Sequence, residues 1–350
     1  MSQHSLFTAP SGTLERELAD VLRASRLDER QASAVAARLG WDGRGASTLQ
    51  QAALAVGYTR ERVRQLEASF RDEVPRDHYR LPLLDRALRA VEECAPDACS
   101  HVGIVLQERG ISGAPFDPTG VLSAAGLFDR PTSASIRRGL VEVAGAPAPT
   151  RTLVANARKL VSARGAAAVV DLARASGVEP ARARRLLELV PDVIWLDEQR
   201  SWIGLRVPNT RRRLDGILRK MLAVGGRLTL TDAEEGLRRS YRPVVLPPAI
   251  LRSLYDGMQW LDVDARRGEI STEIELDRSR VLSPVEERLA AMFVDHGPTL
   301  AFAQAVELGT EIGLNRNTVG YYLTHAPVIK TVRPGRYALR GAAAYEPVAA

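Results

Sequence analysis

A supersecondary pattern recurs along most of this chain and limits the folds that it can adopt. In each copy, a short run of alternating apolar residues meets a polar turn and a second such run, which predicts a β-hairpin. Three clear copies begin at residues 193, 258 and 328, at spacings of 65 and 70 residues, and a weaker copy begins at residue 127. An amphipathic helix precedes each hairpin, so one small unit of helices and a hairpin is repeated. The hairpins span residues 127–143, 193–205, 258–271 and 328–341, and the helices span residues 83–94, 152–162, 213–224 and 285–295.

These repeats divide the chain into several expected domains. Three helices followed by a hairpin resemble the winged-helix fold, and we expect tandem winged-helix repeats over residues 82–146, 150–207, 210–277 and 280–341. Helices near residues 14–25, 28–39, 48–56 and 59–74 predict a helix-turn-helix domain over residues 12–75, with Asp28 as an N-cap. Residues 1–11 and 342–350 are expected to be flexible tails, and residues 75–82 a linker. The predicted fold class is therefore mainly α, with short β-hairpins.

Composition narrows the class of protein further. Hydrophobic residues make up 45% of the chain and charged residues 26%, as in ordinary folded proteins. No apolar run approaches the ~18–20 residues of a membrane span, and no export signal is recognised. The only cysteines are Cys94 and Cys99, which excludes a disulfide scaffold and predicts a reducing, cytoplasmic location.

The charge is basic, with a net value of +6, and all basic residues except Lys159, Lys220 and Lys330 are arginine. Arginine suits the recognition of phosphate and guanine because its planar fork offers paired donors. A GC-rich genome would enrich arginine codons in the same way. The composition therefore permits nucleic-acid binding without requiring it.

Residues 48–67 carry the sharpest functional signal. At ~100° per residue, Val63, Leu66 and Phe70 share one face of the second helix of this segment. Ala53 is small where two helices must cross closely, and Gly57 suits the tight turn between them. The opposite face offers side chains that can pair with base edges in the major groove. The predicted DNA-binding residues here are Thr59 (also the expected N-cap), Arg60, Glu61, Arg62, Arg64 and Gln65. The alternative is a solvated face of i,i+4 partners, which is common in proteins.

The stretches LDERQASAVAARLGWDG and TLQQAALAVGYTRERVRQLEA resemble region four of primary-type bacterial sigma factors, the part that reads the upstream promoter element. The resemblance covers residues 28–74 and implies DNA contacts by Arg60, Glu61, Arg64 and Gln65, with Arg62 near the backbone. It also implies docking of the first two helices on RNA polymerase as an alternative role. The chain lacks the aromatic-rich segment that melts promoters, since aromatic residues are 5% and scattered. We therefore do not expect a complete sigma factor.

The same helix-turn-helix spacing fits two of the repeats. In the second repeat, the matching positions are Ala173, Gly177, Ala183 and Leu186, and the predicted open face carries Arg182, Arg184 and Arg185. In the fourth repeat, the matching positions are Gly309, Gly313, Val319 and Tyr322. Its predicted DNA contacts are Asn315, Arg316, Asn317 and Thr318 at the start of a helix, and Arg333 and Arg336 in the wing. Winged helices also serve as spacers or protein-docking modules, and the first and third repeats are expected to be mainly structural.

Catalytic, metal and cofactor motifs are not recognised. The sequence has no GxxxxGK[ST], GxGxxG or Gly-x-Ser-x-Gly motif, and its five histidines are scattered. Cys94, Cys99 and His101 lack zinc-ligand spacing, so two buried thiols near a helix end are expected instead. We therefore expect no catalytic residues, no metal and no cofactor.

Two classes of function remain open. The first hypothesis is a double-stranded DNA-binding protein that regulates transcription. The alternatives are an interaction or scaffold protein that docks on RNA polymerase, and a DNA-binding subunit of a multi-protein defence or genome-maintenance complex. Binding to DNA through several phosphates should weaken steeply with salt, whereas apolar docking should not. The target sequence, the direction of regulation and the oligomeric state are left open.

Overall fold

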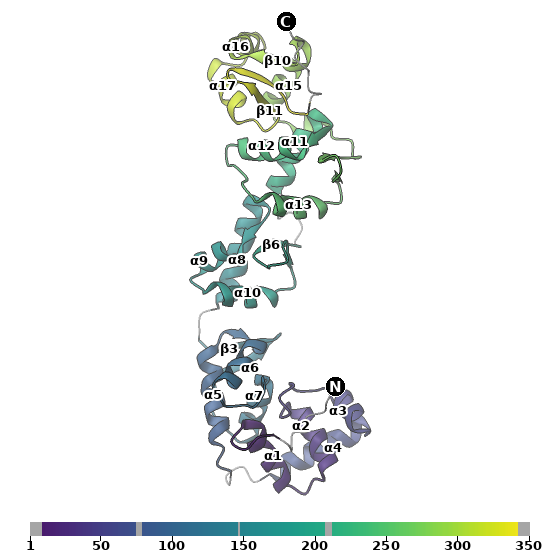
Figure 1. Ribbon diagram of the computed structural model, residues 1–350, viewed down its shortest axis with the longest axis vertical. Helices are drawn as coiled ribbons and strands as arrows, with labels where there is room; N and C mark the ends of the chain where they lie inside the picture. Colours follow the sequence, from purple (N-terminus) through teal and green to yellow (C-terminus); the bar gives the residue numbers. More distant parts are fainter. Residues whose placement is uncertain (1–8, 75–78, 146–147, 207–211, 342–350) are drawn as a thin grey trace. The chain divides into compact units, whose positions relative to one another are not determined.

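The computed structural model describes residues 9–74, 79–145, 148–206 and 212–341 (Figure 1). Within this part of the chain the protein is mainly helical, with small antiparallel sheets of three strands. It divides into two compact units: Met1–Arg151 with Ala181–Pro191, and Thr152–Pro180 with Asp192–Ala350. None of the helices described is both long and apolar enough to cross a membrane. The expected tails lie largely outside the described residues, as do residues 75–78 of the expected linker, and Pro82 already begins a helix.

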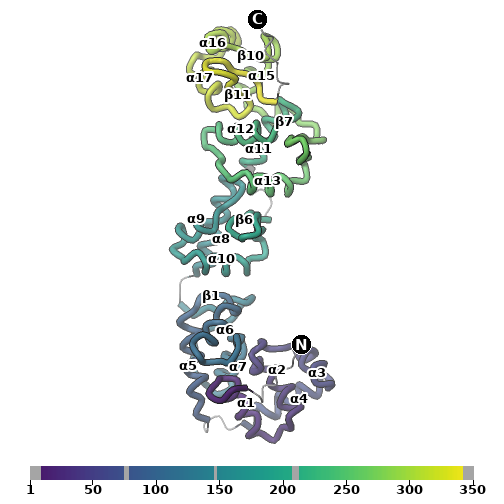
Figure 2. Tube along the Cα trace, viewed as in Figure 1, coloured from purple at the N-terminus to yellow at the C-terminus, as the bar shows by residue number. Residues whose placement is uncertain are grey.

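The first unit contains eight helices and one sheet among its described residues. The helices are α1 (Leu14–Ala24), α2 (Glu29–Leu39), α3 (Leu49–Val56), α4 (Arg60–Glu73), α5 (Pro82–Cys94), α6 (Cys99–Glu108), α7 (Pro118–Leu127) and α10 (Pro180–Glu188). The strands are β1 (Asp97–Ala98), β2 (Ala134–Arg137) and β3 (Leu140–Val143), in the order β1-β3-β2. Helix α1 lies against α5, and α2 against α7 (Figure 2). The helix-turn-helix segment and the first repeat therefore pack on each other.

Trp41 lies at the centre of this unit. It is fully buried, meets Phe70 of α4 edge-on at 5.7 Å between ring centroids, and stacks on Phe128 at 6.1 Å. Its indole Nε1 donates to Ser123 Oγ of α7 at 3.1 Å. One hydrophobic core thus continues from the leading helices into the first repeat, and α4 is held on a rigid support.

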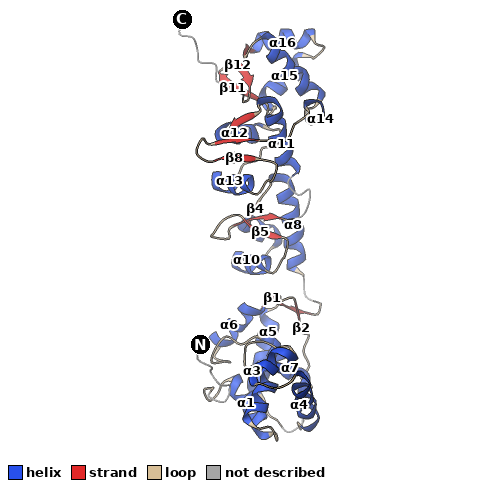
Figure 3. Cartoon of the chain, turned by 90° about the vertical axis from the view of Figure 1, so that its right-hand side faces the viewer, coloured by secondary structure: helices blue, strands red, loops and turns tan. Residues whose placement is uncertain are grey.

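The second unit carries three sheets among its described residues (Figure 3). Their strands are β4 (Ala167–Ala168), β5 (Val193–Trp195) and β6 (Trp202–Leu205); β7 (Arg227–Thr229), β8 (Asp262–Asp264) and β9 (Glu269–Ser271); and β10 (Thr299–Ala301), β11 (Ile329–Arg333) and β12 (Arg336–Leu339). The helices are α8 (Pro149–Arg164), α9 (Val169–Ser176), α11 (Arg212–Gly225), α12 (Leu230–Arg239), α13 (Pro248–Asp256), α14 (Arg278–Val281), α15 (Pro284–His296), α16 (Phe302–Glu311) and α17 (Arg316–His325). Residues 149–151 of α8 belong to the first unit.

Each of the four predicted segments contains a hairpin, but the first hairpin begins at Ala134 and not at residue 127, which ends α7. Each sheet also has a third strand that the sequence did not reveal. In every sheet, a strand of two or three residues precedes a helix and pairs with the last strand of the hairpin. Such a strand is too short to show a period of two residues. The order first–third–second is the same in all four sheets described, which supports the internal repetition.

Arg340 joins the third and fourth repeats inside the second unit. The residue is 1% exposed, although it carries a charge. Its guanidinium donates to Asp232 at 3.1 Å, to Glu235 at 3.2 Å and to the carbonyl oxygen of Pro327 at 3.0 Å. A buried charge is tolerated when it is paired and hydrogen-bonded in this way. The contact fixes α12 against the last hairpin.

Candidate nucleic-acid interface

Helices α3 and α4 are joined by a short turn that contains Gly57. Gly57 has a φ of +68°, and its N–H donates to the carbonyl oxygens that end α3. Thr59 is the N-cap of α4, where its hydroxyl accepts from the N–H of Arg62 at 3.2 Å. Ala53 and Val63 are both buried between the helices. The left-handed turn residue and the small residue at the crossing together fix the angle at which α4 leaves the turn.

The two faces of α4 divide as its periodicity predicts. The residues Val63, Leu66 and Phe70 are buried, and Arg60, Glu61, Arg62, Arg64 and Gln65 are exposed. The buried face anchors the helix in the core that contains Trp41. The predicted site residues on α4 therefore share one open surface, which we call the α4 face.

The polar groups on the α4 face are ordered by one another. Arg64 donates to Glu61 twice, at 2.9 Å through Nε and at 2.7 Å through a terminal nitrogen, and Gln65 donates to the same carboxylate at 3.2 Å. The hydrogen bond from Arg64 lowers the pKa of Glu61, and Glu61 in turn raises the pKa of Arg64. Glu61 and Arg64 are thus charged at neutral pH, and both are held in place together with the neutral amide of Gln65.

Two guanidinium groups on the same helix differ from Arg64. The side chains of Arg60 and Arg62 make no hydrogen bond or ion pair with any part of the chain that is described. Exposed guanidinium groups of this kind can bind phosphate without breaking an internal contact first.

A hollow of about 530 Å³ lies beside the start of α4. Arg60 and Arg38 border it, together with residues 46–50, which lead into α3. Arg38 is held by an ion pair to Glu67 at 2.9 Å and by donation to the carbonyl oxygen of Ser47 at 3.1 Å. The positive end of α3 faces the same region, so its field adds to that of the arginines. No sequence pattern points to Arg38, because only the folded loop brings it next to Arg60.

The predicted open face of α10 is wrong for two of its three arginines, because Arg182 and Arg185 contact the first repeat. Arg185 makes a two-point contact with Asp97, at 3.0 and 2.7 Å, and Arg182 donates to the carbonyl oxygens of Pro96 and Cys94. Only Arg184 is exposed. Asp97 itself is 3% exposed and binds Arg185, which the sequence predicted to contact DNA.

The first turn of helix α17 is open to solvent. Asn315 caps the helix by accepting from the N–H of Thr318 at 2.8 Å, and Arg316 and Asn317 are exposed. Further along, Arg239 donates to the carbonyl oxygen of Leu323, which places α12 against the end of the helix. The predicted base-contacting segment is thereby limited to the helix start.

The predicted wing follows α17. Arg333 is exposed at the end of β11, whereas Arg336 is half-buried and donates to Thr299 Oγ1 at 3.1 Å. Gly335 adopts a φ of +73°, which the tight turn requires. The wing therefore offers one exposed arginine beside its turn and one arginine that ties β12 to β10.

Other chemistries find little support in the described residues. No group of three or more His, Cys, Asp or Glu side chains is placed there to hold a metal ion. Cys99 is buried and Cys94 is half-buried, and both are free thiols. Burial raises the pKa of Cys99 to about 11, so the thiol is protonated at neutral pH and unsuited to nucleophilic attack.

Comparison with known proteins does not assign the chain to a family. No protein-family model matches the sequence, and no curated protein matches it significantly.

Proposed function

We propose that this chain binds double-stranded DNA in a sequence-specific manner and regulates transcription. The observation that carries the proposal is the α4 face, on a helix anchored in the core that contains Trp41. It holds two exposed arginines whose side chains have no hydrogen bond or ion pair within the described residues, and a preoriented cluster of Arg64, Glu61 and Gln65. Arginine and glutamine can pair with guanine and adenine in the major groove, and a carboxylate can accept from cytosine. Arg60 and Arg62 would bind the flanking phosphates.

The repeats are proposed to be winged helices that extend this surface. Their shared strand order and the preceding helices support this fold. In the fourth repeat, Arg316 and Asn317 and the wing residue Arg333 are exposed and would contact DNA. In the second repeat, α10 is engaged by Asp97, so we assign it a structural role.

The likeness of residues 28–74 to sigma region four further supports a role in transcription. The proposed activity is promoter or operator recognition without promoter melting, because the aromatic-rich melting segment of a complete sigma factor is missing from the sequence. The free thiols Cys94 and Cys99 are compatible with action in the cytoplasm.

Selection of binding sites from a pool of random duplexes tests the proposal. The full chain should recover a defined motif, and a variant with Arg60, Glu61 and Arg64 changed to Ala should not. Arg89→Ala is the matched control, because this exposed arginine of α5 lies in the same unit but off the α4 face. Recovery of the same motif by the triple variant would refute α4 as the reading element.

A second candidate function is docking on RNA polymerase. Leu54 of α3 is 71% exposed, which is unusual for a large apolar residue next to a helix-turn-helix core. Leu54→Ala should weaken co-purification with core polymerase under this hypothesis and leave DNA selection unchanged. Unchanged co-purification would remove the support that Leu54 gives to this candidate.

A further inference from the structure

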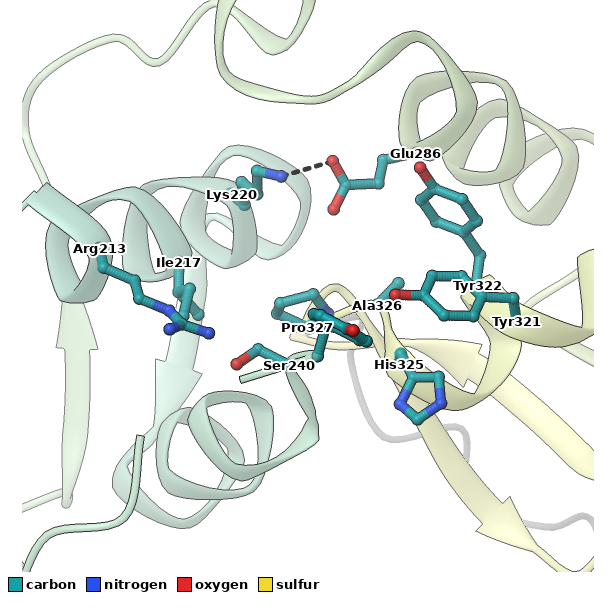
Figure 4. Close-up of a pocket in the computed structure, with 11 residues that line it drawn as sticks. Arg213, Ile217, Lys220, Ser240, Glu286, Tyr321, Tyr322, His325, Ala326 and Pro327 are labelled. Carbon is teal, nitrogen blue, oxygen red and sulfur yellow. Dashed lines mark hydrogen bonds and ion pairs between the residues drawn. The ribbon is translucent and has the colours of Figure 1, made fainter. Parts of the chain in front are cut away.

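A polar and aromatic cavity lies at the junction of the third and fourth repeats, within the second unit (Figure 4). We call it the junction pocket. It has a volume of about 250 Å³ and is enclosed by α11, α15, α17 and the segment after α12. The residues that matter for its chemistry are Arg213, Lys220, Tyr241, Glu286, Tyr321 and His325. None of them takes part in the proposed DNA surface.

Two of the charges in the junction pocket cancel. Lys220 of α11 donates to Glu286 Oε2 of α15 at 2.7 Å, and the N–H of Ser283 donates to the same oxygen at 2.8 Å. Glu286 is only 3% exposed, and no described residue donates to its other oxygen, Oε1. Figure 4 shows this second oxygen turned towards the cavity. This oxygen is an acceptor at the cavity wall, so it can take a hydrogen bond from a molecule bound there.

The opposite side of the pocket carries an uncompensated positive charge. Arg213 is half-buried and donates to the carbonyl oxygen of Arg242, and no carboxylate within the described chain pairs with it. Burial, together with the nearby charge of Arg242, lowers the pKa of Arg213. A guanidinium in this setting is best satisfied by a carboxylate, which matches its paired N–H donors.

Aromatic rings line the space next to these two groups. Tyr241 is 73% exposed and Tyr321 is 44% exposed, and their ring centroids are 6.4 Å apart. The His325 ring lies 4.9 Å from Tyr321. Rings at such distances form a surface on which another planar ring can pack.

We propose that the junction pocket binds a one-ring aromatic monocarboxylate that also carries a hydroxyl or amino donor. The carboxylate pairs with Arg213, the donor binds Glu286 Oε1, and the ring packs on Tyr321 and Tyr241. The volume is below the ~300–1,000 Å³ typical of pockets for drug-sized ligands, which limits the ligand to about one ring. The single uncompensated charge favours a monoanion over a phosphate. This proposal rests on the pocket alone and stands whether or not the chain binds DNA.

Ligand-detected NMR titration of the full chain tests the inference with three probes. The first is 4-hydroxybenzoate, the second is benzoate, which lacks the donor, and the third is 4-hydroxybenzyl alcohol, which lacks the carboxylate. We expect 4-hydroxybenzoate to bind most tightly, benzoate less tightly and 4-hydroxybenzyl alcohol least tightly. Arg213→Gln should weaken binding of 4-hydroxybenzoate by about 10- to 100-fold, as expected for the loss of a charge-assisted contact, and should abolish its advantage over the alcohol.

Two further variants keep the test decisive. Tyr241→Ala alters a largely exposed side chain, so it should preserve folding while weakening all three probes. Arg252→Gln removes an exposed arginine of α13 outside the pocket and should change nothing. Equal losses for Arg213→Gln and Arg252→Gln, equal binding of acid and alcohol, or no saturable binding at millimolar ligand would each overturn the proposal.

Discussion

Replacement of Asp97 by Asn should release helix α10 from the first repeat. Asp97 is buried, and it holds Arg185 through two hydrogen bonds of 3.0 and 2.7 Å. Asn keeps the shape of the side chain and the acceptor for the N–H of Ala98, which lies 2.7 Å from Oδ1. The substitution therefore removes the negative charge that faces the guanidinium of Arg185.

The size of the effect follows from the burial of the two partners. Breaking a fully buried ion pair on one side costs about 3–5 kcal/mol. The side chain of Asp97 is 4% exposed but that of Arg185 is 25% exposed, so water recovers part of the loss. We expect a cost of roughly 2 kcal/mol in the local stability of α10, which corresponds to an open population about 30-fold larger.

Hydrogen exchange followed by mass spectrometry measures this opening directly. Peptides from α10 should exchange about 30-fold faster in Asp97→Asn, while peptides from α15 should not change. Glu93→Gln is the matched control, because it removes a carboxylate from a solvent-exposed ion pair with Arg109. Exchange in α10 within twofold of the native rate, or equal acceleration throughout the chain, would refute a local role for the pair.

Three further outcomes are expected. Arg64→Ala should weaken binding to the selected duplex by about 5- to 100-fold and binding to random DNA much less in gel-shift titrations; equal losses would make Arg64 a phosphate contact. Gly120→Ala should lower the urea midpoint of unfolding, because the new Cβ would lie 2.1 Å from the carbonyl oxygen of Gly40. The expected loss in the free energy of unfolding is roughly 1–3 kcal/mol. An unchanged midpoint would contradict this close approach. Burial raises the pKa of the Cys99 thiol from 9.0 to about 11, so the unfolded chain loses this proton at a lower pH than the folded chain does. The free energy of unfolding should therefore fall as the pH rises from 9 to 11. Urea titrations of Cys99→Ala should show a smaller decline over this range, and an unchanged decline would argue against the shift.

The hairpins and the α4 face could be predicted because both depend on local periodicity. Val63, Leu66 and Phe70 recur at the spacing of one helix face, and the structure buries all three. Thr59 and Gly57 fix the two sides of the turn through their own hydrogen bonding and backbone conformation. Signals of this kind need no knowledge of the rest of the fold.

The contacts of α10 could not be predicted in the same way. Periodicity correctly buries Ala183 and Leu186. It does not reveal that Asp97, 88 residues before Arg185, supplies a buried carboxylate for the neighbouring face. The first strand of each sheet was missed for a related reason, since β1 is only two residues long and exists through its pairing with β3. Both features are set by contacts between distant segments.

The net charge of the chain is therefore a poor measure of how many arginines are available to bind DNA. Arg340 forms hydrogen bonds at the junction of two repeats, and Arg182 and Arg185 form hydrogen bonds with the first repeat. Arg60 and Arg62 carry the same charge, but their side chains have no such contacts within the described chain. They can therefore bind DNA phosphates, which releases the counterions condensed on the DNA. It follows that removing both should reduce the salt dependence of DNA binding, whereas Arg182→Ala should leave it unchanged. An arginine is available to DNA only where the fold places no carboxylate or carbonyl oxygen of the protein next to it.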